Sequence, residues 1–194
     1  MKLSTKDMAL VAMFTSLTAI GAFISIPLGP VPITLQSLFV ILSGLILGPK
    51  LAALSQIVYI LLGLVGAPIF SGFTGGPQSV MAPSFGFVIG FVFAAYLVVR
   101  IAYMDNSLST RNIWIGSLVG SLVIYLFGLP YMYYMLNIIM GNQFSFLNIM
   151  QMGCFLFLPG DLAKLIISSL VGIKILPILY SLGYTHNSLG IKNN

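Results

Sequence analysis

The fold is decided by residues 83–104, which read Pro83-Ser-Phe-Gly-Phe-Val-Ile-Gly-Phe-Val-Phe-Ala-Ala-Tyr-Leu-Val-Val-Arg-Ile-Ala-Tyr-Met104. A helix rises about 1.5 Å per residue, so about 20 such residues cross the roughly 30 Å hydrocarbon core of a bilayer. Across the whole chain 59% of residues are hydrophobic and 6% are charged, whereas about a quarter are charged in soluble domains. Lipid must cover this surface, and the chain is predicted to be an all-α integral membrane protein.

Proline, glycine and charged residues divide the sequence into about six apolar segments, each expected to be a helix: 8–26, 34–47, 51–65, 83–104, 113–136 and 154–182. The second and third are short, and we expect them to tilt, to thin the bilayer or to stop partway. Because no linker interrupts the series, we predict a single transmembrane domain over residues 1–194. The first segment resembles a secretory signal, but no clear cleavage site follows it, and we interpret it as a retained span.

Lysine and arginine indicate which side of the membrane each connection occupies, because short cytoplasmic loops collect these residues. If the N-terminus is inside, the inner ends and connections hold Lys2, Lys6, Lys50, Arg100, Arg111 and Lys192. The outer connections, residues 27–33, 66–82 and 137–153, hold none. This alternation predicts an even number of spans with both termini cytoplasmic. Lys174, inside the last segment, is expected to snorkel inward.

The residue inventory argues against several classes of function. Cys154 and His186 are the only cysteine and histidine, so an internal disulfide is excluded and no metal centre or cofactor is expected. No GxxxxGK[ST] loop, Ser-His-Asp arrangement or catalytic carboxylate pair is found, so an enzyme is not predicted. The net charge of +5 comes from scattered basic residues, which fits membrane orientation better than nucleic-acid binding.

Two of the outer connections are rich in turn-forming residues but partly apolar. They contain residues 25–33 (Ser-Ile-Pro-Leu-Gly-Pro-Val-Pro-Ile) and residues 70–77 (Phe-Ser-Gly-Phe-Thr-Gly-Gly-Pro). Glycine permits positive φ and proline fixes φ near −65°, so such connections can fold compactly over a cavity. We interpret them as a lid on the outer face, with ordinary tight turns between helices as the alternative.

Asp161 and Lys164 are the main charges deep in the apolar sequence, within Leu158-Pro-Gly-Asp-Leu-Ala-Lys164. Intramembrane charges are costly and usually functional. Pro159 and Gly160 interrupt the segment, so Asp161 is predicted to be a helix N-cap, and a lysine three residues later lies on the same helical face. The two side chains can neutralise each other as a structural pair, line a polar pocket, or do both. In a pocket the carboxylate accepts hydrogen bonds from N–H donors, and the ammonium attracts an acid group or a carbonyl.

Weaker candidates lie in or beside the other apolar segments. Those able to hydrogen-bond a ligand or a neighbouring helix are Gln36, Gln56, Tyr59, Gln78, Ser84, Tyr134 and Asn137. For each of them alone, helix packing is the favoured alternative. Phe70 and Phe73 flank a glycine-rich stretch and are candidate walls for an apolar ligand. With only one acidic group at depth and no convincing inverted repeat, binding is favoured over self-powered pumping.

Small residues recur four apart along the first segment, where Ala12 is followed by Ser16, and Thr15 by Ala19. Such spacing lets helix backbones approach closely, either within the protein or against a partner. Two glycine pairs, Gly86 with Gly90 and Gly116 with Gly120, repeat the spacing, and for these packing within the protein is favoured.

Taken in order, the motifs resemble the BioY family, the substrate-capture (S) components of energy-coupling-factor (ECF) biotin transporters. The resemblance spans most of the chain and is carried by Ile26-Pro-Leu-Gly-Pro-Val-Pro-Ile-Thr-Leu-Gln36, Leu45-Ile-Leu-Gly-Pro-Lys50, Tyr59-Ile-Leu-Leu-Gly-Leu-Val-Gly-Ala-Pro-Ile-Phe-Ser-Gly-Phe73, Gly75-Gly76, Pro83-Ser-Phe-Gly-Phe-Val-Ile-Gly-Phe91 and Pro159-Gly-Asp-Leu-Ala-Lys164. The sequence departs at Ala82 and Phe85, where the family pattern is closer to Gly-Pro-Thr-Gly-Gly-Tyr.

The resemblance implies a six-helix protein of the prokaryotic cell membrane that binds biotin from outside. It also implies two kinds of partner, a transmembrane coupling (T) protein and two cytoplasmic ATPases. The implied substrate-binding residues are Asp161, Lys164, Gln36, Tyr59, Phe70, Phe73, Gln78 and Ser84, with Asp161 accepting from the ureido N–H groups of biotin and Lys164 facing either the ligand or Asp161. The implied surface for the coupling protein contains Ala12, Ser16 and Ala19.

Three alternatives to biotin capture stay open from the sequence. An S component for another vitamin would share the architecture and differ in pocket contacts. A secondary transporter or oligomeric channel would work without ATPases. A purely structural membrane protein would bind no ligand at all.

Overall fold

The computed structural model of the protein describes residues 3–104 and 109–181, which are mostly helical. The helices are α1 (Thr5–Phe23), α2 (Gln36–Leu47), α3 (Pro49–Val65), α4 (Phe85–Ala102), α5 (Thr110–Tyr134), α6 (Phe146–Met150) and α7 (Leu158–Ser181). The shorter elements are β1 (Ser25–Ile26), β2 (Ile33–Thr34), the 3-10 helix η1 (Pro77–Met81) and the π-helical turns η2 (Met135–Ile139) and η3 (Gln151–Phe155). Three residues used above, Lys2, His186 and Lys192, lie outside the described ranges.

Within residues 3–104 and 109–181, four helical stretches are long and apolar enough to cross a membrane: Thr5–Phe23, Phe85–Ala102, Thr110–Ile139 and Leu158–Leu179. Helices α2 and α3 are also apolar but have 12 and 17 residues. At about 1.5 Å per residue α2 is roughly 18 Å long, well short of the roughly 30 Å hydrocarbon core. The predicted all-α membrane architecture is confirmed, including the shortness of its second and third helices.

Local sequence explains where the first helices begin and end. The Ser4 side chain accepts from the backbone N–H of Asp7, while the Asp7 carboxylate accepts from the backbone N–H of Ser4, and this capping box starts α1. Between α2 and α3 the chain passes through Gly48, whose φ of 79° suits a residue without a Cβ. Pro49 then begins α3, where its missing N–H is not needed.

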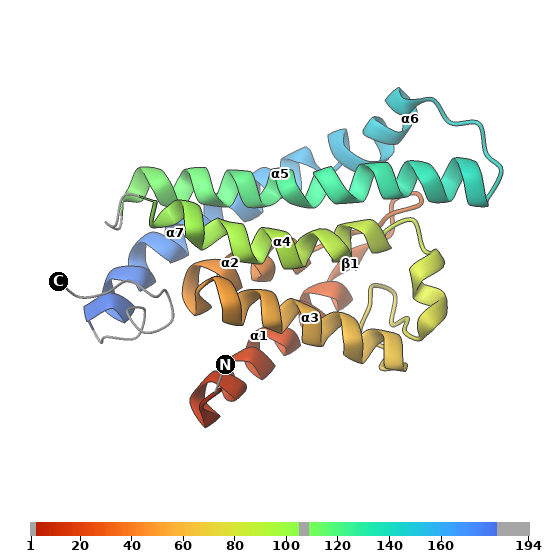
Figure 1. Ribbon diagram of the computed structural model, residues 1–194. Helices are drawn as coiled ribbons and strands as arrows, with labels where there is room; N and C mark the ends of the chain where they lie inside the picture. Colours follow the sequence, from red (N-terminus) through yellow and green to blue (C-terminus); the bar gives the residue numbers. More distant parts are fainter. Residues whose placement is uncertain (1–2, 105–108, 182–194) are drawn as a thin grey trace.

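The helices alternate in direction between two ends of the molecule. In Figure 1 the start of α1, the α2–α3 junction, the end of α4, the start of α5 and the last described residues of α7 lie toward one end. The β1–β2 hairpin, η1 and α6 lie toward the other end. The basic residues Lys50, Arg100 and Arg111 belong to helix ends of the first group. This arrangement agrees with the predicted alternation and makes the first end the cytoplasmic one.

Helices α4 and α5 run side by side and approach closely at their glycines (Figure 1). A Cβ added at Gly86 would lie 2.2 Å from the Cβ of Tyr131, and one at Gly116 would lie 2.4 Å from the carbonyl oxygen of Val98. The second glycine of each pair also faces the neighbouring helix. Packing within the protein is therefore confirmed for both glycine pairs.

The last predicted segment differs from the structure in its boundaries. Helix α5 continues through η2, and α6 and η3 occupy part of the predicted outer connection, so that α7 starts at Leu158 instead of residue 154. Pro159 lies in the first turn of α7, where a residue without an N–H is tolerated. The prediction that Asp161 is an N-cap is wrong, because its backbone N–H already donates to the carbonyl of Phe157, at 2.8 Å, inside the first turn.

Candidate functional site

A cavity lies among the β1–β2 hairpin, α2, the α3–α4 connection, α4, α5 and the start of α7. Its space not filled by protein atoms, including the open mouth, is about 920 Å³. Most of its lining is apolar, with polar side chains from several elements converging on it. This combination suits an amphipathic small molecule.

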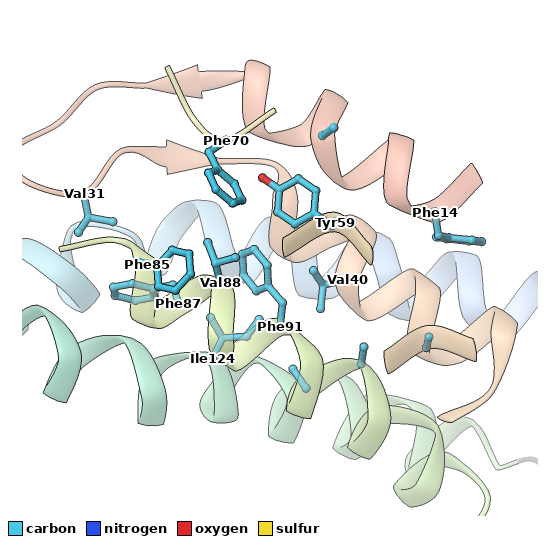
Figure 2. Packing of buried hydrophobic residues seen from close by; sticks show 14 of the residues in the cluster. Phe14, Val31, Val40, Tyr59, Phe70, Phe85, Phe87, Val88, Phe91 and Ile124 are labelled. Carbon is cyan, nitrogen blue, oxygen red and sulfur yellow. The ribbon is translucent and has the colours of Figure 1, made fainter. Parts of the chain in front are cut away.

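Aromatic side chains form much of the wall. Figure 2 shows Phe85, Phe87 and Phe91 projecting from α4 below Phe70 of the α3–α4 connection. The rings of Phe70 and Phe85 meet edge to face, with centroids 6.1 Å apart, a favourable aromatic geometry. Ile124 of α5 closes the same apolar region. These groups can enclose a ring or alkyl chain but offer it no hydrogen bonds.

The two glycine- and proline-rich outer connections take part in the cavity. Residues 31–34, in and just before β2, line it, and so do Phe70, Ser71 and Thr74 of the α3–α4 connection. In β1 and β2, Ser25 pairs with Thr34 in an antiparallel hairpin. These placements favour the lid interpretation over ordinary turns.

Asp161 and Lys164 form an ion pair in the cavity lining. The Lys164 ammonium nitrogen lies 2.6 Å from Oδ1 of Asp161, and the side chains of Lys164 and Asp161 are 8% and 20% exposed. The same nitrogen donates to the carbonyl oxygen of Thr34 at 2.8 Å and to the hydroxyl of Ser37 at 3.1 Å. Since an ammonium group has three donors, all of them are engaged.

Tyr125 of α5 completes the surroundings of the carboxylate, because its hydroxyl donates to Oδ2 of Asp161. A carboxylate has about four lone-pair sites, so Asp161 can still accept further hydrogen bonds. Among the described lining residues, Asp161 and Lys164 are the charged ones, and their formal charges cancel. The site therefore favours a neutral polar group with N–H donors over a second carboxylate.

Gln36, at the start of α2, joins the hairpin to α3. Its Oε1 accepts from the hydroxyl of Thr34 at 3.0 Å, and its Nε2 donates to the hydroxyl of Tyr59 at 2.7 Å. The Tyr59 hydroxyl in turn donates to the carbonyl oxygen of Ile69 at 3.0 Å. The carbonyl oxygen of Thr34 is therefore bonded to Lys164 of the ion pair, and its hydroxyl is bonded to Gln36.

The structure brings five of the eight predicted substrate-binding residues to the cavity: Asp161, Lys164, Gln36, Phe70 and Ser84. Tyr59 is fully buried behind the lining. Phe73 is 66% exposed and stacks on Phe23 of α1, with centroids 4.5 Å apart. Gln78 is exposed and donates to the carbonyl oxygen of Gly75. These last three residues lie outside the cavity lining, in contrast to the expectation that they face a ligand.

Two of the three remaining weaker polar candidates bond other residues of the protein. Gln56 of α3 is fully buried, and its Nε2 donates to the hydroxyls of Thr18 on α1 and Ser43 on α2, each at 3.4 Å. Asn137 bonds the backbone of Phe144 in both directions. For Gln56 the helix-packing alternative is therefore confirmed, whereas Asn137 holds the segment that follows it. Tyr134 is half-exposed at the outer end of α5 and is not part of the cavity lining.

Several lining residues were missed from the sequence. Tyr125 and Ser37 carry no motif of their own, and they reach the ion pair only because α5 and α2 pack beside α7. Ser71 and Ser79 line the cavity as well, and their buried hydroxyls have no hydrogen-bond partner among the described residues. Buried polar groups without a hydrogen-bond partner are uncommon in proteins, so these hydroxyls are positions where a bound molecule would supply the missing hydrogen bond. The turn-rich composition around Ser71 was the only sequence signal for it.

The outward face of α1 contains only part of the predicted docking surface. Ala12 and Ser16 are exposed, whereas Ala19 is 8% exposed and lies in the core cluster. Thr15, on the same buried side, donates to the carbonyl oxygen of Ser55 at 2.9 Å. Ala19 therefore packs within the protein, and a partner could reach Ala12 and Ser16 only.

The apolar helices enclose a cavity with an aromatic wall and a charged pair in its lining. This architecture is that of a membrane-embedded protein that binds small molecules. The family model described as the BioY family matches residues 1–181. The chain belongs to the BioY family. Together with its spanning helices, this membership makes it a multi-pass protein of the prokaryotic cell membrane and a transport component rather than an enzyme.

Individual relatives agree with this family. A protein of Lysinibacillus sphaericus named as a probable biotin transporter BioY is 36% identical over 178 residues, covering 92% of this chain and 90% of that protein. The biotin transporter BioY of Thermotoga maritima is 36% identical over 163 residues, covering 84% and 90%. A crystal structure of the S-component for biotin from an ECF-type ABC transporter superimposes with a TM-score of 0.77 at 26% identity, covering 90% of this chain and 94% of that chain. The similarity thus extends over nearly the whole described fold.

Proposed function

We propose that the protein captures biotin from the outer side of the membrane as the S component of an ECF-type importer. The observation that carries the proposal is the cavity, whose aromatic wall ends at the Asp161–Lys164 pair. Biotin has a matching division, with a ureido head, an apolar thioether ring and a carboxylated tail. Similarity to proteins named for biotin supports the choice of this vitamin.

Asp161 is proposed to receive the ureido N–H groups. One of its oxygens accepts from Lys164 and the other from Tyr125, and both oxygens retain lone pairs. The three donors of Lys164 are already engaged by Asp161, Thr34 and Ser37. Lys164 is therefore assigned to holding and neutralising Asp161, so that the carboxylate is the group that meets the ligand.

The rest of the ligand is proposed to fill the aromatic part of the cavity. Phe70 and Phe85 suit the apolar ring by size and geometry. The hydroxyls of Ser71, Ser79 and Ser84 are polar candidates for the tail, and the first two lack partners among the described residues. Because the Asp161–Lys164 pair has no net charge, nothing there attracts the tail carboxylate, which favours its lying toward the mouth.

A transmembrane coupling protein and two cytoplasmic ATPases are proposed as the partners that drive release into the cell. Ala12 and Ser16 form the part of the predicted docking surface that is exposed on α1. Small side chains there permit the close helix approach that a membrane partner needs.

Equilibrium binding of labelled biotin to the detergent-solubilised protein tests the proposal, with riboflavin and thiamine as competitors. We expect saturable binding that unlabelled biotin displaces and the other vitamins do not, and that Asp161→Asn weakens. Thermal unfolding of each variant controls for loss of fold. Folded wild-type protein that binds no biotin would contradict the proposal. Displacement by another vitamin, or gradient-driven uptake by vesicles containing this chain alone, would favour the corresponding alternative.

A further inference from the structure

We propose that Tyr59 is a positioning residue that couples the ligand end of the cavity to residues 66–76 of the α3–α4 connection, which supply Phe70, Ser71 and Thr74 to the lining. The inference rests on the proposed function, because it concerns how bound biotin is retained. Tyr59 was predicted to touch the ligand, but it is fully buried and is not part of the cavity lining. Its role must therefore be exerted through other residues.

The coupling starts at the ion pair and passes through Thr34. Lys164, held by Asp161 at 2.6 Å, donates to the carbonyl oxygen of Thr34 at 2.8 Å. The hydroxyl of the same threonine donates to Oε1 of Gln36 at 3.0 Å. A ligand that shifts Asp161 therefore also shifts Lys164 and, through it, Thr34. Thr34 in turn holds the Gln36 side chain.

The second half runs from Gln36 through Tyr59 to the connection. The Gln36 amide donates to the Tyr59 hydroxyl at 2.7 Å, and that hydroxyl donates to the carbonyl oxygen of Ile69 at 3.0 Å. Tyr59 thus uses its hydroxyl both as acceptor and as donor, in surroundings without water access. Buried hydrogen bonds of this kind are costly to leave unmade and polarise one another along a chain.

Ile69 is followed directly by Phe70, whose side chain lines the cavity. The ring of Phe70 packs edge to face on the Tyr59 ring with centroids 5.4 Å apart (Figure 2). Phe70 also lies directly over Gly63 of α3, where an added Cβ would be 2.2 Å from its ring. The Tyr59 hydroxyl and ring therefore fix the backbone before Phe70 and the orientation of Phe70 itself.

Other contacts hold the same connection without reaching the ion pair. The backbone N–H of Gly76 donates to the carbonyl oxygen of Gly63 at 2.7 Å, and Phe73 stacks on Phe23. The Tyr131 hydroxyl donates to the carbonyl oxygen of Val80, farther along the link between α3 and α4. Tyr131 therefore offers a matched control, since it also joins a helix to this link by a tyrosine hydroxyl but is not bonded to Gln36 or Thr34 by any of these contacts.

The test compares Tyr59→Phe with Tyr131→Phe in the full-length protein. Tyr59→Phe keeps the ring on Phe70 and removes only the hydroxyl, and we expect labelled biotin to dissociate about tenfold faster, with little change in association. Tyr131→Phe is expected to leave the dissociation rate within about twofold of wild type. Thermal unfolding of both variants separates this effect from a general loss of stability.

A spin label on the connection tests the coupling directly. Its mobility should respond to biotin only if Tyr59 links the ligand to the connection, and not if Tyr59 only stabilises the fold. With Cys154→Ser removing the native thiol, Pro68→Cys places a label on the exposed part of the connection. We expect biotin to immobilise this label in the otherwise wild-type protein and in Tyr131→Phe, but much less in Tyr59→Phe.

The outcomes separate this inference from the proposed function. If wild-type protein binds biotin, and Tyr59→Phe releases it at the wild-type rate with the label immobilised as before, the inference is overturned and the proposed function stands. If folded wild-type protein binds no biotin, the proposed function is overturned and the ligand coupling with it. Faster release and a mobile label in Tyr59→Phe alone would support the inference.

Discussion

The ammonium nitrogen of Lys164 lies 2.8 Å from the carbonyl oxygen of Thr34, a residue 130 positions earlier in the chain. This hydrogen bond joins the second turn of α7 to the end of the β1–β2 hairpin. The same nitrogen holds Asp161, so one side chain both neutralises the partly buried carboxylate and fixes an outer connection in place. A change at Lys164 should therefore affect stability and ligand binding together.

Lys164→Met is expected to leave Asp161 without its compensating charge. Removing one partner of a buried pair costs roughly 3–5 kcal/mol, and the partial exposure of Asp161 places the expected loss near the lower figure. Thermal unfolding in detergent should show a lower midpoint, and biotin binding should weaken at least tenfold. Lys174→Met, an exposed lysine on the same helix, is the control and should change neither. Equal behaviour of the two variants would contradict the assigned role of Lys164.

Tyr125→Phe should weaken biotin binding about tenfold while leaving the fold intact, because it removes one hydrogen bond to the carboxylate that is proposed to meet the ligand. Isothermal titration or filter binding measures the change. Tyr134→Phe alters a half-exposed tyrosine of the same helix and should bind as wild type. Unchanged affinity in Tyr125→Phe would show that Asp161 does not depend on this contact.

Gly86→Ala should destabilise the protein by about 1–3 kcal/mol, because the new methyl group would overlap the Cβ of Tyr131 at the close approach of α4 and α5. The comparison is Gly160→Ala, where an added Cβ would meet only the Cγ2 of Ile33, at 4.0 Å. Thermal unfolding should separate the two variants clearly. Equal midpoints would mean that α4 and α5 can move apart at little cost.

Ser16→Trp should abolish biotin uptake in cells that contain the proposed partners and leave biotin binding by the purified protein unchanged. A large side chain on the exposed face of α1 would block close approach of the coupling protein. Leu126→Trp, on an exposed position of α5, serves as the control for bulk in a lipid-facing site. Uptake by Ser16→Trp at the wild-type rate would place the docking surface elsewhere.

The sequence predicted those parts of the site that depend on local spacing. Asp161 and Lys164 are three apart on one helix, which is enough to bring their side chains together. Likewise, glycines four apart favoured close packing within the protein, and the structure shows that α4 and α5 pack on each other at these positions. The run of apolar residues predicted the membrane helices because the hydrocarbon thickness sets their length.

The rest of the site could not be predicted, because it depends on how distant elements pack. Tyr125 reaches Asp161 across 36 residues, and no local pattern distinguishes it from other tyrosines of α5. Phe73 and Phe70 flank the same glycine, yet Phe70 turns into the cavity while Phe73, at a φ of 58°, stacks on Phe23. Ala19 and Ser16 are both small, and only the packing of α1 buries Ala19.

The bond from Lys164 to Thr34 also sets when the protein can first become competent during synthesis. The carboxylate and the ammonium group come from the last described helix, whereas their partners come from residues 34–37 and from Tyr125. A nascent chain that has not yet inserted α7 lacks both charged residues of the lining, so the Asp161–Lys164 pair cannot form. Occupancy by the vitamin would then report that α7 has entered the membrane and docked, so ligand can favour completed chains over those stalled before the final insertion step.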